Sequence, residues 1–224
     1  MWMTSVLYDA QSDWKLDATK PRQELTRFKF PRNQDKKKAG GPNPCLSDLV
    51  APIMAQRSDW VGVFALTAGH GLDELVAEFQ KVGDDYNALL SKVLADRLAE
   101  AFAEELHERV RKDLWGYASE ENLSFSELFE SKYRGIRPAF GYPACPDHTD
   151  KQLAFDLLGA EQKCGMKLTE SDMMLPAASV CGLYFANPSS YYFGVGVLAE
   201  DQVVDWAERK GIDTESARKR SGRA

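Results

Sequence analysis

A proline-rich decapeptide, residues 137–146 (RPAFGYPACP), carries the side chains best suited to binding a small charged molecule. Arg137 offers a planar, permanently charged guanidinium that can pair with a carboxylate through two parallel hydrogen bonds. Tyr142 offers an aromatic face with a polar tip, and Gly141, which has no Cβ, lets a ligand approach the backbone closely. Three prolines exclude a helix interior or a central strand, so we expect extended backbone with polar groups available to a ligand. A plain surface loop has the same composition, so the residues alone leave both interpretations open.

The longest element expected to position this segment is a helix from Asp84 to about Tyr117. Apolar residues recur there every four positions, which predicts an amphipathic helix whose apolar stripe faces the core. Charged residues fill the other faces, many of them three or four positions from an opposite charge. We expect this helix to be the spine of the domain. The stripe consists of Tyr86, Leu90, Leu94, Leu98, Phe102, Leu106, Val110 and Leu114, widened by Leu89 and Val93.

Shorter elements surround this helix. A continuous apolar run at 60–67 predicts a buried strand, and alternating apolar and polar residues at 24–30 predict a half-buried one. A capping box at Ser124 predicts a short helix toward Tyr133. A basic, frayed tail is expected at the C-terminus. The remaining expected elements are helices at 72–81, 149–165 and 200–210 and strands at 166–171, 177–185 and 191–198, the last two forming an antiparallel hairpin around a turn at 187–190.

Length and composition are those of a globular domain. The chain has 224 residues, of which 44% are hydrophobic and 28% charged, enough for one full core. We expect a partly mobile N-terminal segment at 1–44, which contains a lysine, glycine and proline loop, and a domain at 45–224. The net charge of −6 argues against nucleic acid and against anionic membranes as partners. No apolar run approaches the roughly 20 residues that span a bilayer.

The four cysteines are scattered and form no Cys-x-x-Cys pair. This pattern predicts free thiols in a reducing compartment rather than a disulfide framework or a zinc site. The N-terminus also lacks the basic-then-apolar pattern of a secretion signal. A cytoplasmic location is therefore expected.

Three motifs with possible chemistry lack the context they need. Glu104-x-x-His107 is half of a di-iron signature, which requires the motif twice, and no second copy occurs. The expected strand, glycine turn and helix at 60–81 have the order of a phosphate-binding loop, but they lack both the Gly-x-Gly-x-x-Gly fingerprint and the Walker lysine. Gly194-x-Gly196 lies inside a late expected strand, so an ordinary Rossmann-type methyltransferase is excluded.

Four segments, in this order, resemble the activation domain of cobalamin-dependent methionine synthase. The Arg137-x-x-x-Gly141-Tyr142-Pro143 motif is similar to the family's S-adenosylmethionine-binding signature, and the resemblance spans roughly residues 45–211. The combination of this motif with the long-helix sequence is highly specific. The segments are DDYNALLSKVLADRLAEAFAEELHERVRKDLWGYA at 84–118, GIRPAFGYPACPDHTDK at 135–151, GMKLTES at 165–171 and GLYFANPSSYYFGVG at 182–196.

The resemblance implies a helmet-shaped, or C-shaped, α+β domain with a twisted antiparallel sheet and a long central helix. Such a domain binds S-adenosylmethionine and sits over the corrin of a cobalamin-binding domain or protein. After cob(I)alamin has oxidised to inactive cob(II)alamin, an electron from flavodoxin or a flavoprotein reductase and a methyl group from S-adenosylmethionine restore methylcobalamin. The chain is thus implied to be a component of a methyltransferase of methionine biosynthesis, inactive without its partners, because the cofactor carries the chemistry.

The resemblance also implies which residues bind S-adenosylmethionine, and it implies no catalytic or metal-ligating residue. Arg137 would hold the methionyl carboxylate, while backbone around Ala139 and Gly141 would meet the adenosyl and amino groups. Phe140 stands where the family usually has proline, a change that need not disturb the motif. The complete implied set is Arg137, Ala139, Gly141, Tyr142, Tyr191, Tyr192 and Glu100.

Aromatic and acidic residues complete the implied site. Tyr142 would pack beside the ligand, and Tyr191 and Tyr192 would close the other side. Glu100, on the long helix, matches an acidic position that faces this pocket, and its charge would attract the sulfonium. Family members carry a further N-terminal segment with another acidic ligand-binding residue, for which no equivalent is carried over here.

Two alternatives stay open at this point. The missing N-terminal equivalent is compatible with a docking or chaperone protein that caps a cobalamin-binding partner but has lost ligand binding. The intact Arg137, Gly141, Tyr142 and Tyr191 favour a binding-competent module instead. The sequence fits a free-standing activation protein and an excised fragment equally well.

Overall fold

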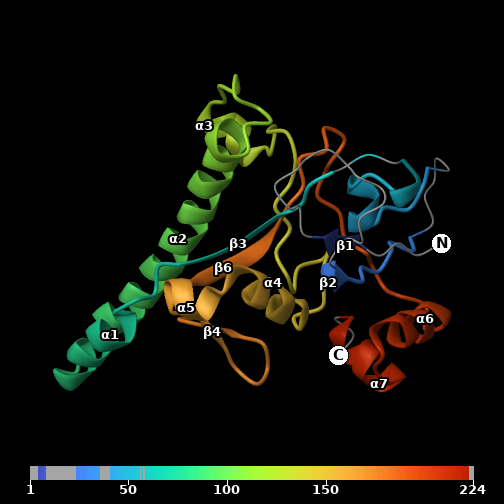
Figure 1. Ribbon diagram of the computed structural model, residues 1–224. Coiled ribbons are helices and arrows are strands. Elements are labelled where there is room, and N and C mark those ends of the chain that lie inside the picture. The colour runs from blue at the N-terminus through green and yellow to red at the C-terminus, as the bar shows by residue number, and fades with distance from the viewer. Residues whose placement is uncertain (1–4, 9–23, 36–40, 56, 58, 222–224) are drawn as a thin grey trace. The chain divides into compact units, whose positions relative to one another are not determined.

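The structure is a computed structural model that describes residues 5–8, 24–35, 41–55, 57 and 59–221 (Figure 1). The chain divides into two compact units. The first contains residues up to Gly62 together with Gly135–Leu153 and Leu183–Ala224, and the second contains Val63–Arg134 and Ala154–Gly182. Helices and small sheets are combined throughout, which confirms the predicted α+β class. The loop expected to be mobile falls largely on 36–40, outside the described residues.

The second unit is built on the long helix that the sequence predicted. Helix α1 (Leu72–Lys81) leads into α2 (Asp85–Arg109), the long green helix of Figure 1. Asp84 caps α2, because its side chain accepts a hydrogen bond from the Asn87 amide at 3.0 Å. A π-helical turn, Val110–Leu114, extends the helix. The helix predicted at 84–117 is therefore confirmed.

The predicted buried face of α2 is wrong. The large apolar residues lie mostly exposed, with Tyr86 74% and Leu98 61% accessible. The buried positions of α2 are instead Ala88, Ala95, Ala99, Ala103 and His107. Alanines spaced by three to four residues or a multiple form a smooth face that neighbouring backbone can approach closely, so small side chains rather than large ones are buried here.

A buried ion pair lies in the π-helical turn at the end of this helix. The Arg111 Nε donates to both carboxylate oxygens of Glu121, at 2.8 and 3.0 Å, and the Arg111 side chain is completely buried. The guanidinium also lies 4.5 Å from the centre of the Tyr133 ring. The pair therefore joins the π-helical turn to the segment that follows it.

We expect the Glu121→Gln variant to unfold at lower urea concentration, with a loss of about 1–3 kcal/mol in the free energy of unfolding. The amide keeps an acceptor but leaves the buried guanidinium without its counter-charge. Glu120→Gln is the matched control, since Glu120 is exposed and its neutralisation should change stability by less than about 0.5 kcal/mol. Equal midpoints for the two variants would contradict this role of the pair.

Two short strands, β3 (Gly62–Thr67) and β6 (Ser179–Tyr184), pair with each other. They run in opposite directions, because Gly62 lies against Tyr184 while the Ala68 amide donates to the Ala178 oxygen at 2.9 Å. A second antiparallel pair joins β4 (Lys167–Leu168) to β5 (Met174–Leu175). The helices between α2 and β4 are α3 (Phe125–Phe129), α4 (Asp150–Leu158) and α5 (Ala160–Cys164).

The hairpin predicted between 177–185 and 191–198 is wrong. Residues 191–198 form no strand, and Gly196 has φ of 68°. Their backbone turns to other segments, with the Val195 amide donating to the Pro143 oxygen at 2.8 Å and the Gly194 oxygen accepting from the Asn33 side chain at 2.7 Å. Two glycines in a short run interrupt the strand and allow this irregular path.

The first unit contains the remaining elements. The antiparallel pair β1 (Ser5–Tyr8) and β2 (Glu24–Phe28) confirms the predicted strand at 24–30. Two short 3-10 turns follow, Leu46–Leu49 and Ile53–Ala55.

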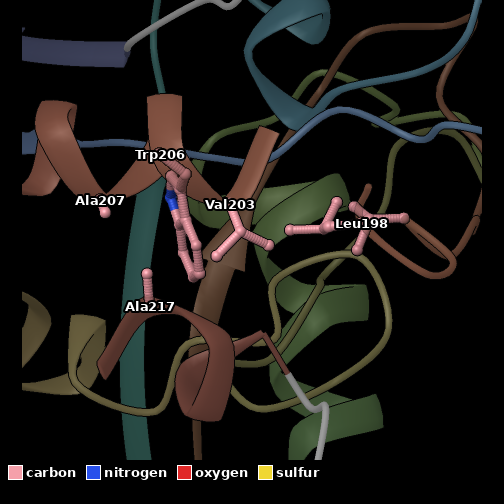
Figure 2. Packing of buried hydrophobic residues seen from close by; sticks show 6 residues of the cluster. Leu198, Val203, Trp206, Ala207 and Ala217 are labelled. Carbon is pink, nitrogen blue, oxygen red and sulfur yellow. The ribbon is translucent and has the colours of Figure 1, made fainter. Parts of the chain in front are cut away.

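Helices α6 (Glu200–Lys210) and α7 (Thr214–Arg220) end the described chain, so the expectation of a frayed tail directly after α6 is wrong. Figure 2 shows Trp206 beside Val203, with the Ala217 methyl group of α7 pointing toward the indole. The Trp206 indole N–H also donates to the Lys29 oxygen at 2.7 Å. Burial of this apolar cluster and a satisfied indole explain why the basic tail folds.

Candidate functional site

The segment before Gly141 lies along the end of β6. The Ile136 amide and the Phe185 oxygen, and the reverse pair, are 3.0 Å apart, and the Leu183 amide donates to the Pro138 oxygen at 3.0 Å. Backbone groups alternate between the two edges of an extended segment. The backbone groups of Arg137 and Ala139 therefore point to the opposite edge, away from β6.

Tyr192 meets that opposite edge. Its hydroxyl oxygen accepts a hydrogen bond from the Arg137 amide at 3.1 Å, which brings together two of the residues predicted for the site. The neighbouring Tyr191 has its ring 5.8 Å from that of Phe193, and both Tyr191 and Tyr192 are exposed. The Arg137 side chain belongs to a half-buried residue. The structure thus places the Tyr192 phenol beside the Arg137 backbone, with the exposed Tyr191 next to it in the sequence.

A tight turn follows at Gly141, whose φ of 87° lies in the region that favours glycine. The Gly141 amide donates to the Cys145 oxygen at 2.8 Å, and the Cys145 amide donates to the Tyr142 oxygen at 2.9 Å. Tyr142 is left 58% exposed at the tip of the turn. The adjacent Phe140 is buried and stacks on Phe28 with ring centres 5.8 Å apart, so one face of the turn is anchored in the core.

A buried charge cluster lies directly after the turn. The Lys210 ammonium is 2.5 Å from a carboxylate oxygen of Asp147 and 2.6 Å from one of Asp150, and all three side chains are buried. Burial raises the pKa of Asp150 to about 6. Burial opposes the charge of Lys210, but the two carboxylates outweigh it and raise the pKa of this ammonium. The cluster ties α6 to the residues that leave the loop.

Sequence reasoning missed this cluster. Asp147 lies just before the helix predicted at 149–165, and Lys210 is the last residue of the helix predicted at 200–210. The signal was weak, since nothing in the local sequence relates a lysine to two aspartates 60 and 63 positions earlier.

Glu100 lies on α2 in the second unit and is exposed. Its membership of the site remains a prediction. His107 is buried with its ring edge-on to Tyr133, at 4.9 Å between centres. Among the described residues, no three or more His, Cys, Asp or Glu side chains are grouped so as to hold a metal ion. No helix in the described part of the chain combines the length and apolarity needed to cross a membrane.

Comparisons with known proteins identify the family of the chain. Residues 3–211 match the family model described as vitamin B12 dependent methionine synthase, activation domain. The chain is also similar to a crystal structure of the MetH reactivation domain bound to AdoHcy, with 49% sequence identity and a TM-score of 0.85. That similarity covers 91% of this chain and 62% of the other, so the chain spans less than two thirds of the solved domain's length. The chain belongs to the family of activation domains of vitamin B12-dependent methionine synthase.

Proposed function

We propose that this chain binds S-adenosylmethionine and serves as the activation module of a B12-dependent methionine synthase. The observation that carries the proposal is the extended segment at Arg137 and Ala139, which the Tyr192 hydroxyl borders at the Arg137 amide and which ends in the left-handed turn at Gly141. The 49% identity to a domain solved with AdoHcy bound supports the ligand class.

Each residue has a role that its chemistry allows. The Arg137 guanidinium would pair with the carboxylate of the ligand, which is the interaction that its fork favours. The Ala139 and Gly141 backbone would meet polar groups of the amino-acid and nucleoside parts. Exposed Tyr142 and Tyr191 would cover the ligand with aromatic surface.

Tyr192 would act as a bridge between this backbone and the ligand, since its hydroxyl accepts a hydrogen bond from the Arg137 amide. Glu100 would contribute a negative charge that attracts the sulfonium. The isolated chain would have no further part in bond making, because none of these residues is a nucleophile or a general base placed for methyl transfer.

The partners follow from the chemistry of the family. Cobalamin, held by a separate domain or protein, would supply the methyl-accepting and one-electron chemistry. A reductant such as flavodoxin or a flavoprotein reductase would supply the electron. All four cysteines are free thiols, which fits a reducing compartment such as the cytoplasm.

Calorimetric titration of the 224-residue chain with S-adenosylmethionine and with AdoHcy tests the proposal. We expect saturable heat with both ligands at a stoichiometry of one. A chain that binds neither ligand would instead be a docking protein for its cobalamin partner, and the proposal would fall. Adding ligand and a thiol acceptor without any cobalamin protein should produce no methylated product.

A further inference from the structure

The imidazole of His148 fills the space beside Gly141. An ideal Cβ added to Gly141 would lie 2.5 Å from Nε2 and 2.8 Å from Nδ1 of this ring, far inside contact distance. Two independent reasons therefore require glycine at position 141: its φ of 87°, and the histidine ring that occupies the space of a Cβ. The ring and the turn are packed as one unit.

Lys151 holds this ring from the first turn of α4. Its ammonium nitrogen is 2.7 Å from His148 Nδ1, and Lys151 is only 3% exposed. A lysine ammonium can only donate hydrogen bonds, so Nδ1 accepts and the ring proton sits on Nε2. The arrangement requires a neutral imidazole, because a protonated ring would lose its acceptor and place a second cation against Lys151.

We propose that His148 is a positioning residue for the ligand-binding turn. The neutral imidazole, oriented by Lys151, supports the left-handed backbone at Gly141 and so fixes the direction of Tyr142 and of the Ala139 edge. His148 itself contacts no ligand and acts through Gly141. The proposal rests on the proposed binding of S-adenosylmethionine at this turn.

The proposal carries a pH signature. Protonation of the imidazole, which removes the acceptor at Nδ1, should loosen the turn and weaken ligand binding at low pH. Charged groups near His148 include Lys151 of α4, the Asp147 and Asp150 carboxylates held by Lys210 of α6, and Arg220 of α7, which donates to Thr149 at 3.3 Å. Burial raises the pKa of Asp150 to about 6, so the contribution of this carboxyl to any pH dependence must be separated from that of His148.

Calorimetry with S-adenosylmethionine at about pH 8 and about pH 5.5 separates the two groups. His148→Asn keeps an acceptor near the position of Nδ1 but removes the ring and the titration. We expect it to weaken binding about three- to tenfold at the higher pH and to show little further loss at the lower pH. Wild type should lose affinity at the lower pH, and Asp150→Asn should keep that loss. A His148→Asn variant with wild-type affinity and pH dependence would overturn the proposal.

A pair of variants tests the same contact without changing pH. Gly141→Ala should weaken binding strongly in the wild-type background, where the new methyl group meets the imidazole. In a His148→Ala background the same substitution should cost at least about threefold less, since only the strain of the positive φ remains. Equal costs in both backgrounds would mean that the ring does not support the turn. Thermal melts of all four proteins show that each is folded.

Failure of the proposed function would be recognised separately. If wild type binds neither S-adenosylmethionine nor AdoHcy at either pH, the ligand assignment is wrong. ¹⁵N NMR of the unliganded chain can then show which ring nitrogen of His148 carries the proton. A His148 ring protonated on Nδ1 at about pH 8 would overturn the Lys151 arrangement itself.

Discussion

The Arg137→Ala variant is expected to bind S-adenosylmethionine at least tenfold more weakly than wild type. A bidentate, charge-assisted contact to a carboxylate is worth about 1.5–3 kcal/mol, and alanine removes it entirely. Arg137→Lys should fall between the two proteins, because a lysine retains the charge but not the planar fork. Calorimetric titration at a fixed salt concentration measures all three affinities.

Arg27→Ala is the matched control for this measurement. Arg27 is an exposed arginine of the same unit, paired with Glu24 at 2.7 Å on the surface. Exposed pairs contribute little to stability, so its loss should leave both the fold and the ligand affinity unchanged. If Arg137→Ala and Arg27→Ala bind equally well, Arg137 has no part in the site.

The Lys210→Met variant is expected to lose about 3–5 kcal/mol of unfolding free energy at pH 7.5, the largest stability effect that we predict. Methionine fills a similar volume but leaves two buried carboxylates, Asp147 and Asp150, without their cation. Urea denaturation followed by tryptophan fluorescence measures the loss, since Trp206 lies on the same helix.

The deficit of Lys210→Met should shrink at about pH 5. The pKa of Asp150 is raised to about 6 in the folded protein, against about 3.9 in an unfolded chain. Between these two values the folded state holds a proton that the unfolded state has released, so folding becomes more favourable as the pH falls through this window. Removing the lysine should raise this carboxyl pKa further and make the effect larger than in wild type.

Two further variants make the interpretation specific. Lys219→Met removes an exposed lysine of α7 and should change stability by less than about 0.5 kcal/mol. Adding Asp150→Asn to Lys210→Met should recover part of the loss at pH 7.5, because one of the two uncompensated charges is gone. A Lys210→Met deficit that is independent of pH and unaffected by Asp150→Asn would show that packing, not charge, is lost.

Local sequence signals predicted most helices well. The four-residue apolar spacing predicted α2, and the box at Ser124 and Glu127 predicted α3, whose reciprocal hydrogen bonds are present. These signals depend on interactions within one turn or one helix, and such interactions are complete in a short stretch of chain. Boundaries were less accurate, since Gly159, at φ of 62°, breaks the helix predicted at 149–165 into α4 and α5.

The two larger errors have one cause. The side of α2 that carries leucines was expected to be buried, but the alanine side is buried instead. The run at 191–198 was expected to pair with β6, but β6 pairs with β3, and its end pairs with the segment at Ile136. In both cases the sequence shows that a helix can bury one side or that a strand can pair with a neighbour. The shape of the neighbouring segments decides which side is buried and which neighbour pairs.

The sequence by itself determined the family, the candidate binding segment and the residue types that suit a ligand with a carboxylate. These depend on the order of side chains along one short stretch and on its similarity to related chains. Only the tertiary structure decided that Tyr192 meets the Arg137 amide, that His148 fills the space beside Gly141, and that Lys210 forms ion pairs with Asp147 and Asp150. The contacts of Tyr192 with Arg137 and of Lys210 with the aspartates join residues more than 50 positions apart. The contact between His148 and Gly141 is nearer in sequence and depends on the path of the turn. Their energies exist only once the chain has folded, so no local pattern of residues specifies them.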